Sequence, residues 1–91
     1  MLEKDIEKKL VDGVKKLGGR AFKWASPGNV GVPDRIIILP GGRIIFVELK
    51  TERGVVRPVQ KVMISLLRGL GCDVRVLKGI NDVTGFLEEI R

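Results

Sequence analysis

The chain has 91 residues, of which 44% are hydrophobic and 31% charged, a balance typical of one small globular domain and not of a disordered segment. It contains no histidine, which excludes Ser-His-Asp triads, histidine general bases and histidine-ligated metals, and the lone Cys72 allows neither an internal disulfide nor a cysteine-rich zinc site. The formal net charge of +6 favours a polyanionic partner, most often nucleic acid, although a merely solvated basic surface would give the same value.

The sequence indicates neither a membrane span nor a signal peptide. No apolar run approaches the roughly 18 residues that a membrane span needs. The residues at positions 2–5, Leu-Glu-Lys-Asp, lack the apolar core of a signal peptide. We therefore expect a cytoplasmic protein with no membrane partner.

The first predicted element is an amphipathic helix over residues 2–17. Its apolar side chains recur at helical spacing, and Gly18-Gly19 is expected to end it. These apolar side chains are Ile6, Leu10, Val14 and Leu17. A short strand is predicted over residues 21–25, and the prolines and glycines of residues 26–33 predict a loop.

Two β-branched, nearly continuous apolar runs over residues 35–39 and 43–47 predict a pair of strands. Residues 40–42, Pro-Gly-Gly, predict a tight hairpin between them. Because strands of this composition are usually buried on both sides, we expect both faces of the pair to be covered. The polar stretch 51–56 predicts a loop.

A second helix is predicted from Pro58, a residue suited to a first helical turn, to about residue 70, where Gly71 caps it. Its apolar stripe consists of Val59, Met63, Leu66, Leu67 and Leu70. Residues 73–77 alternate as a strand, and Asn81 is expected to cap a final helix that ends near residue 90. Its inward side chains are expected to be Val83, Phe86, Leu87 and Ile90. The order αβββαβα predicts one α/β domain over residues 1–91, with a mixed central sheet flanked by helices.

The length of the hairpin loop determines which side chains share a face. If the loop is residues 40–42, Leu39 faces Arg43 and Asp34 lies opposite Glu48. Opposed side chains have Cβ atoms about 4.5–5.5 Å apart, so two carboxylates there repel unless a proton or a cation lies between them. Lys50 joins the same face if the strand continues that far. A slip of one residue would separate the two acids.

Two carboxylates beside a lysine can support phosphodiester hydrolysis without histidine. Carboxylate oxygens suit Mg²⁺ or Mn²⁺, whose remaining positions take water and phosphate oxygen. Such an ion polarises a phosphodiester and makes a bound water more acidic, and a lysine ammonium can hold that water or stabilise the pentavalent phosphate. The alternative is that Asp34 is a turn residue and that Glu48 and Lys50 are ordinary strand-end residues on a solvated face. The apolar run that precedes Glu48 argues against this alternative.

The same residues resemble a known family. Pro33-Asp34, thirteen intervening residues and Glu48-Leu49-Lys50 resemble the PD-(D/E)XK nuclease signature. With the surrounding segments 31–35, 40–43 and 47–50 and the later Gln60, nearly the whole chain resembles the virus-type replication–repair nuclease domain, VRR-NUC. It is also similar in its fold core to Holliday-junction resolvases. The resemblance implies a restriction-endonuclease-like fold.

The resemblance also implies roles for individual residues. Asp34 and Glu48 would bind a divalent metal through their side chains, and Leu49 through its backbone carbonyl. Lys50 would position or activate the attacking water, and Gln60 would orient Lys50 or contact the phosphate.

The family carries a further acid on its first helix, for which Glu3 and Glu7 are alternatives. They lie four residues apart and on the same helical face. Either acid could instead serve only the helix dipole, which favours negative charge in a first turn.

Lysine and arginine side chains supply phosphate contacts that do not depend on base sequence. Arg53 and Arg57 flank the loop that follows the Glu48 strand, and Arg20 and Lys23 lie near the first strand. Few aromatic residues and no further domain are present to read base edges, so we expect recognition of DNA shape rather than of sequence.

We therefore expect a Mg²⁺- or Mn²⁺-dependent endodeoxyribonuclease that is selective for branched DNA such as Holliday junctions and acts in DNA repair. Junctions have near two-fold symmetry and a small monomer offers little surface to hold one, so we expect a homodimer, as family analogy also implies. No small-molecule cofactor is expected, and a phage-encoded chain would act in the host cytoplasm. The alternatives are a less selective nuclease or nickase, and a non-catalytic basic module that binds nucleic acid.

Overall fold

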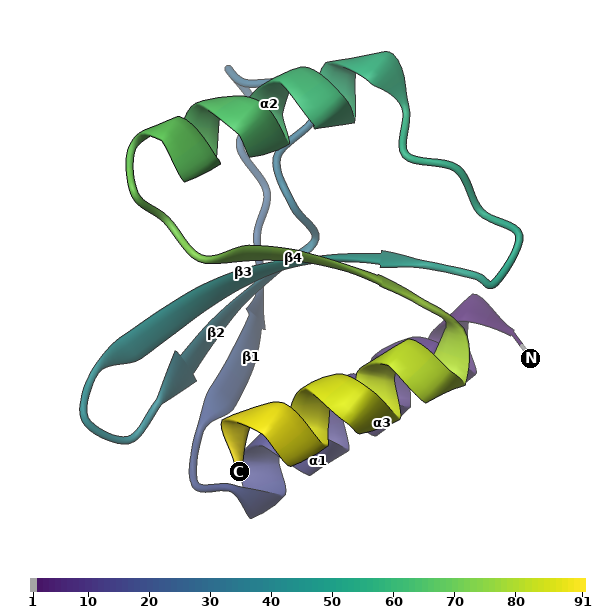
Figure 1. The fold of residues 1–91 in the computed structure, drawn as a ribbon, viewed down its shortest axis with the longest axis vertical. Helices are drawn as coiled ribbons and strands as arrows, with labels where there is room; N and C mark the ends of the chain where they lie inside the picture. Colours follow the sequence, from purple (N-terminus) through teal and green to yellow (C-terminus); the bar gives the residue numbers. More distant parts are fainter. Residues whose placement is uncertain (1) are drawn as a thin grey trace.

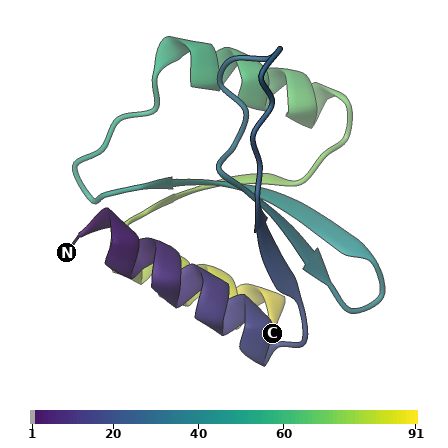
Figure 2. The same ribbon diagram turned by 180° about the vertical axis from the view of Figure 1, so that it is seen from behind.

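The computed structural model describes residues 2–91, which form three helices and one four-stranded sheet. In chain order the elements are α1 (Glu3–Lys16), β1 (Arg20–Lys23), β2 (Arg35–Leu39), β3 (Arg43–Lys50), α2 (Pro58–Gly69), β4 (Val74–Lys78) and α3 (Gly79–Ile90). Helices α1 and α3 lie side by side on one face of the sheet, and α2 lies on the other (Figures 1 and 2). The predicted α/β order is confirmed. None of the helices within residues 2–91 has both the length and the apolar character needed to cross a membrane.

The sheet is mixed, as the sequence predicts, with the strand order β1-β2-β3-β4. Strands β1, β2 and β3 pair antiparallel, and β4 returns after α2 to pair parallel to β3. The hairpin loop is residues 40–42, and Gly41 and Gly42 have φ values of 86° and 80°, which L side chains rarely adopt. Strand β3 runs three residues beyond its predicted end and therefore carries both Glu48 and Lys50.

The hydrophobic core lies between the sheet and the α1–α3 pair. On this face Ile37 of β2 and Ile45 and Val47 of β3 are fully buried. The predicted apolar stripes of the two helices supply the other side of the core, with Ile6, Leu10 and Val14 from α1 and Val83, Phe86 and Ile90 from α3. The core thereby anchors α1 beneath the strands that carry the two candidate carboxylates.

The opposite face of the sheet is covered only in part. Phe22, Ile38 and Ile44 point to this face and remain 53%, 38% and 49% exposed. The prediction that β2 and β3 are covered on both faces is therefore wrong for this region. The reason is that α2 packs against β4, at the sheet edge far from β1 and β2.

The predicted apolar stripe of α2 does not supply the contact with the sheet. Val59, Leu66 and Leu70 are 44%, 55% and 74% exposed, and the residues that α2 buries are Gln60 and Ile64. Helical periodicity shows which side chains share a face, but it does not show whether another element covers that face.

Glycine ends the first two helices as predicted, but the start of α3 differs from the prediction. Gly71, with φ of 90°, follows α2, and its N–H donates to the Arg68 carbonyl oxygen. Asn81 does not cap α3, because the helix already begins at Gly79, directly after β4. Gly79 has φ of 80°, and the Asp82 carboxylate accepts a hydrogen bond from the Lys78 N–H at 2.8 Å, so Asp82 caps this turn.

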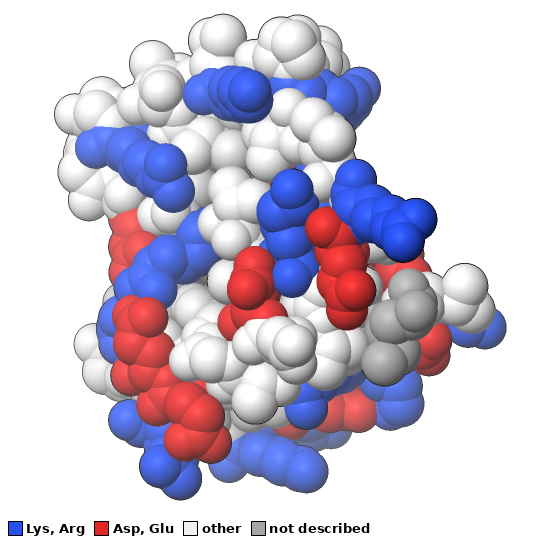
Figure 3. Space-filling model, turned by 45° about the vertical axis from the view of Figure 1, so that its right-hand side comes forward, with Lys and Arg blue, Asp and Glu red and all other residues white. Residues whose placement is uncertain are grey.

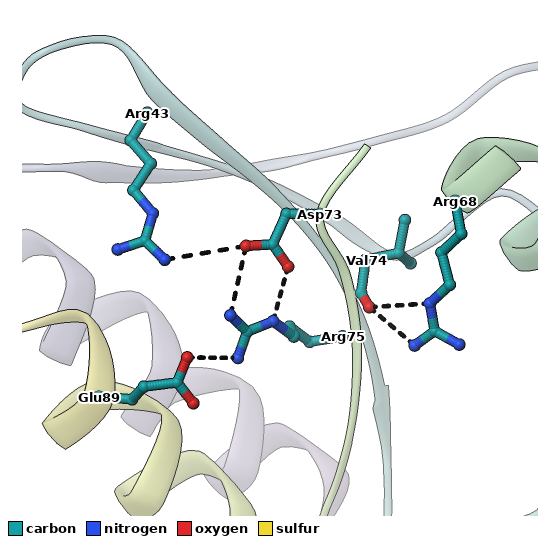
Figure 4. Close-up of polar contacts among 6 residues, drawn as sticks. All are labelled: Arg43, Arg68, Asp73, Val74, Arg75 and Glu89. Carbon is teal, nitrogen blue, oxygen red and sulfur yellow. Dashed lines mark hydrogen bonds and ion pairs between the residues drawn. The ribbon is translucent and has the colours of Figure 1, made fainter. Parts of the chain in front are cut away.

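Ion pairs tie the start of β4 to its neighbours (Figure 4). Asp73 pairs with Arg75 at 2.6 Å and with Arg43 of β3 at 3.8 Å, and Arg75 also pairs with Glu89 of α3 at 2.8 Å. Arg68 of α2 donates to the Val74 carbonyl oxygen at 2.8 Å. These contacts connect α2, α3 and β3 through one edge strand, so the three arginines have structural partners.

Candidate active site

Strand pairing brings the two candidate carboxylates into one row. Arg35 pairs with Val47, so Asp34 and Glu48 occupy the next opposed positions, which is the register that the three-residue loop predicts. Lys23 pairs with Arg35 in the same way, and the backbone N–H of Trp24 donates to the Asp34 carbonyl oxygen at 2.9 Å. The row therefore runs from Trp24, directly after β1, through Asp34, directly before β2, to Glu48 of β3.

Glu48 is a buried carboxylate with only part of its hydrogen bonding satisfied. It is 1% exposed, and its Oε2 accepts a hydrogen bond from Gln60 Nε2 at 2.8 Å. The same oxygen lies 3.2 Å from Lys50 Nζ. Among the buried side-chain oxygen and nitrogen atoms of residues 2–91, only Glu48 Oε1 has no hydrogen-bond partner. A buried oxygen without a hydrogen-bond partner lowers the stability of the fold, so this atom points to a partner that is missing.

Burial raises the pKa of Glu48 above its ordinary value, and the nearby charge of Asp34 raises it further. Lys50 opposes both effects without cancelling them. Additional positive charge beside this carboxylate would favour its ionised form. The residues present therefore fit a divalent cation, which would meet the orphaned oxygen of Glu48 and offset its repulsion from Asp34.

Asp34 is exposed and is held by the strand that carries Glu48. Its Oδ2 accepts a hydrogen bond from the Leu49 N–H at 2.8 Å. The Leu49 side chain belongs to the core and the residue is 4% exposed, so Leu49 can serve such a site only through its peptide group. The candidate donors are therefore the two carboxylates and the backbone carbonyl oxygen of Leu49. Residues 2–91 contain no group of three or more histidine, cysteine, aspartate or glutamate side chains arranged to hold a metal.

A cavity of about 510 Å³ opens beside Asp34 and Leu49. Its remaining lining comes from the start of α1, the end of β1 with the two residues that follow it, and the first residue of β2, namely Glu3, Glu7, Lys23, Trp24, Ala25 and Arg35. Both candidate acids of α1 therefore reach this cavity. Glu7 forms an ion pair with Arg35, whereas Glu3 is exposed. Glu3 and Glu7 remain alternatives for the additional acid, and Glu3 is the one that the Arg35 pair leaves available.

The VRR-NUC domain family model matches residues 3–81, which include α1, the whole sheet and the candidate site. The chain belongs to the VRR-NUC domain family. It therefore carries a nuclease domain.

Relatives of this VRR-NUC domain agree with the assignment. A protein of Acyrthosiphon pisum secondary endosymbiont phage 1, named "Putative nuclease p44", is 49% identical over 75 residues, which is 82% of this chain and 81% of the relative. A solved VRR-NUC domain superposes with a TM-score of 0.90 at 31% identity and covers 98% of this chain and 97% of its own. A second solved VRR-NUC domain protein, with a TM-score of 0.74 at 20% identity, shares the fold; it covers 97% of this chain and 86% of its own.

Gln60 supports the site from α2 in a way that the sequence did not specify. Its Nε2 donates to Glu48, and its Oε1 accepts a hydrogen bond from the Arg57 N–H at 2.9 Å. Gln60 and Lys50 meet through the Glu48 oxygen that they share. The amide therefore holds the orientation of Glu48 and connects it to the first turn of α2.

The basic residues expected to contact phosphate lie in three places on this VRR-NUC domain. Lys23 lines the cavity beside Asp34, and Arg53 and Arg57 are exposed in the segment between β3 and α2. Arg20 instead borders a separate hollow between α1 and β1, which Asp12 and Lys15 also line. No acidic residue occurs between Glu52 and Asp73, and the upper part of Figure 3 accordingly shows blue and white side chains without red ones.

Two residues of the cavity were missed at the level of sequence. Arg35 follows Asp34 directly, and its N-H groups reach back to Glu7 and to the Ala21 carbonyl oxygen. Trp24 packs on Phe46 with ring centroids 5.1 Å apart. Both contacts join elements that are distant along the chain, so only the strand register could have indicated them.

Proposed function

We propose that this VRR-NUC domain is a Mg²⁺- or Mn²⁺-dependent endonuclease that hydrolyses phosphodiester bonds in branched DNA, such as flaps and Holliday junctions. The observation that carries the proposal is Glu48. This carboxylate is 1% exposed and keeps one oxygen without a partner, opposite Asp34 and beside Lys50. A nuclease family and a related phage protein named as a nuclease support the reaction class.

In the proposed mechanism, the Asp34 and Glu48 side chains and the Leu49 carbonyl would hold the divalent cation. When bound, such a cation polarises the phosphodiester and makes a coordinated water more acidic. Lys50, whose Nζ lies 3.2 Å from Glu48 Oε2, would hold the attacking water and stabilise the negative charge that develops on the phosphate. Gln60 keeps Glu48 in place through its 2.8 Å hydrogen bond.

Phosphate binding is assigned to the basic side chains around this site. Lys23 lies at the cavity, and Arg53 and Arg57 are exposed on the segment that leads from β3 to α2. Arg20 is more remote and would contact DNA that extends past the end of α1. A chain that contacts phosphates from several elements recognises the path of the backbone, which favours shape over sequence.

A homodimer is part of the proposal. An exposed apolar stripe along α2 and the residues that flank it supports the dimer, because its side chains are between 44% and 74% exposed. We call this the α2 stripe, and its members are Val55, Val59, Val62, Leu66 and Leu70. A two-fold dimer would place two sites on a branched substrate of matching symmetry. The phage relative supports action in the cytoplasm of a host cell.

The proposal is tested by digesting four-way junctions, flaps, linear duplex and single strands side by side, with Mg²⁺, Mn²⁺ or EDTA. We expect cleavage of the branched substrates with either metal and none with EDTA. Lys50→Ala and Glu48→Gln should each lower the rate by two orders of magnitude or more, in line with the roughly 10²–10³-fold cost of removing one group that stabilises developing charge. Lys8→Ala removes an exposed lysine that pairs only with Asp12 and should leave the rate unchanged.

Three outcomes would contradict parts of the proposal. Equal cleavage of duplex and junction would favour the less selective nuclease. Binding without cleavage at any metal concentration would favour the non-catalytic basic module. Full activity of both site variants would show that the reaction takes place elsewhere on the molecule.

A further inference from the structure

Trp24 is the one tryptophan of the chain, and it stands at the candidate active site. Its backbone N–H donates to the Asp34 carbonyl oxygen at 2.9 Å, which continues the β1–β2 ladder by one position. Directly opposed residues of antiparallel strands have Cβ atoms about 4.5–5.5 Å apart. Trp24 also lines the same cavity as Asp34 and Leu49.

The ring is held in place but not fully covered. Trp24 packs on Phe46 with centroids 5.1 Å apart and an angle of 36° between the ring planes. The residue as a whole is only half-buried. An aromatic ring that packs on one neighbour, in a half-buried residue that lines a cavity, has the form of a stacking platform.

The neighbouring charges fit a nucleotide rather than a purely apolar ligand. Lys23 and Trp24 both line the cavity. Asp34 and Glu48 lie in the same row as Trp24. A phosphate at the carboxylate end of this row would place its own or the adjacent base near the indole. In duplex DNA that base is stacked on its neighbours, whereas at a branch point or in a single strand it is free to leave the stack.

We propose that Trp24 stacks on an unpaired base adjacent to the scissile phosphate and thereby favours branched or single-stranded DNA over duplex. Trp24 is then a specificity-determining residue, which acts on substrate choice and not on the bond-breaking step. The inference rests on the proposed cleavage of DNA at Asp34 and Glu48.

Intrinsic fluorescence tests the contact without requiring cleavage. Wild-type protein in EDTA is titrated with oligothymidylate and with blunt duplex of the same length, at low salt, and binding is followed in parallel by the anisotropy of a labelled strand. We expect oligothymidylate to quench the tryptophan emission saturably and duplex to quench it much less. Binding by anisotropy with unchanged emission would overturn the proposal, and so would the absence of any binding.

Variants test the consequence for specificity. Trp24→Ala should lower the ratio of kcat/KM for a flap to kcat/KM for duplex by roughly 5- to 150-fold, the loss that corresponds to one base–aromatic stack. Trp24→Phe keeps an aromatic face and should retain most of the ratio. Phe22→Ala, two residues before Trp24 and 53% exposed, serves as the matched control and should leave the ratio unchanged.

The ratio separates a stacking role from a purely structural one. Loss of packing on Phe46 alone would lower both kcat/KM values equally and leave their ratio unchanged, which would overturn the proposal. If wild-type protein cleaves none of these substrates with Mn²⁺ and yet shows the expected quenching, the proposed function fails while the stacking contact stands.

Discussion

At the scale of single residues, Glu48 is the side chain on which the proposed chemistry depends most. Among residues 2–91, the polar contacts of its buried side chain reach only Oε2, which meets both Gln60 and Lys50, and Oε1 has no partner. Residues that serve function are often placed where they lower stability. Glu48 fits this description because burial and Asp34 both act against its ionised form.

Replacing Glu48 with glutamine is expected to stabilise the metal-free protein at neutral pH. The pKa of Glu48 is higher in the folded protein than its unfolded value of 4.5, so folding favours the protonated side chain. The protonated side chain therefore contributes stability fully below pH 4.5, and this contribution is lost as the pH rises through the pKa of the folded state. The pKa of Glu48 is raised even though Lys50 lowers it by favouring the ionised carboxylate. Glu48→Gln removes the charge and keeps an oxygen that can accept from Gln60.

Thermal unfolding in EDTA measures this effect. At pH 7 the midpoint of Glu48→Gln should exceed that of the wild type, and the difference should shrink as the pH falls towards 4.5. A variant that melts below the wild type at pH 7 would show that the ion pair with Lys50 outweighs the burial of the charge.

The residue scale also shows what the sequence could predict. Asp34, Glu48 and Lys50 were placed on one face because a three-residue loop fixes the register, and the pairing of Leu39 with Arg43 confirms that loop. Trp24 was not anticipated, because its role in the site depends on the pairing of β1 with β2 and on its contact with Phe46.

At the scale of elements, the sequence predicted every helix and strand but not how α2 packs. Burial of Gln60 and Ile64, four residues apart, defines the inner face of α2. The apolar residues that dominate its sequence pattern lie on another face. An uncovered apolar stripe is unusual on a monomer and is typical of an interaction surface.

Substitution of Leu66 tests the proposed dimer. Leu66 is 55% exposed within the α2 stripe, so Leu66→Glu should abolish self-association with little effect on folding. Ser65→Glu adds the same charge to the same helix outside the stripe and should leave the dimer intact. Sedimentation at micromolar concentration measures both. A wild-type chain that sediments only as a monomer would contradict the dimer.

The turn from β4 into α3 gives a prediction about stability. A Cβ at Gly79 would lie 2.3 Å from Glu52 Cγ, and Gly79 has φ of 80°. We expect Gly79→Ala to lower the free energy of unfolding by about 1–2 kcal/mol.

Gly85 provides the control within the same helix. A Cβ there meets nothing within 4 Å, and Gly85→Ala should raise stability by up to about 1 kcal/mol. Chemical denaturation compares the two variants, and equal effects would show that the Gly79 turn can relax.

At the scale of the whole molecule, three features lie around the ends of β1 and β3. The cavity joins the start of α1 to the ends of β1 and β3, the segment after β3 carries exposed arginines, and residues 53–72 contain no acid to repel a polyanion. Composition alone predicted the polyanionic partner. The meeting of these features depends on the strand order, which places β1, β2 and β3 side by side.

The central claim is that Asp34 and Glu48 bind one divalent cation together. Isothermal titration of Mn²⁺ into the DNA-free protein tests it most directly, with Glu48→Gln and Asp34→Asn as site variants and Lys8→Ala as the control. We predict one Mn²⁺ per chain for the wild type and for Lys8→Ala, and binding weakened at least tenfold in each site variant. Unchanged Mn²⁺ affinity in Glu48→Gln and Asp34→Asn would contradict the claim.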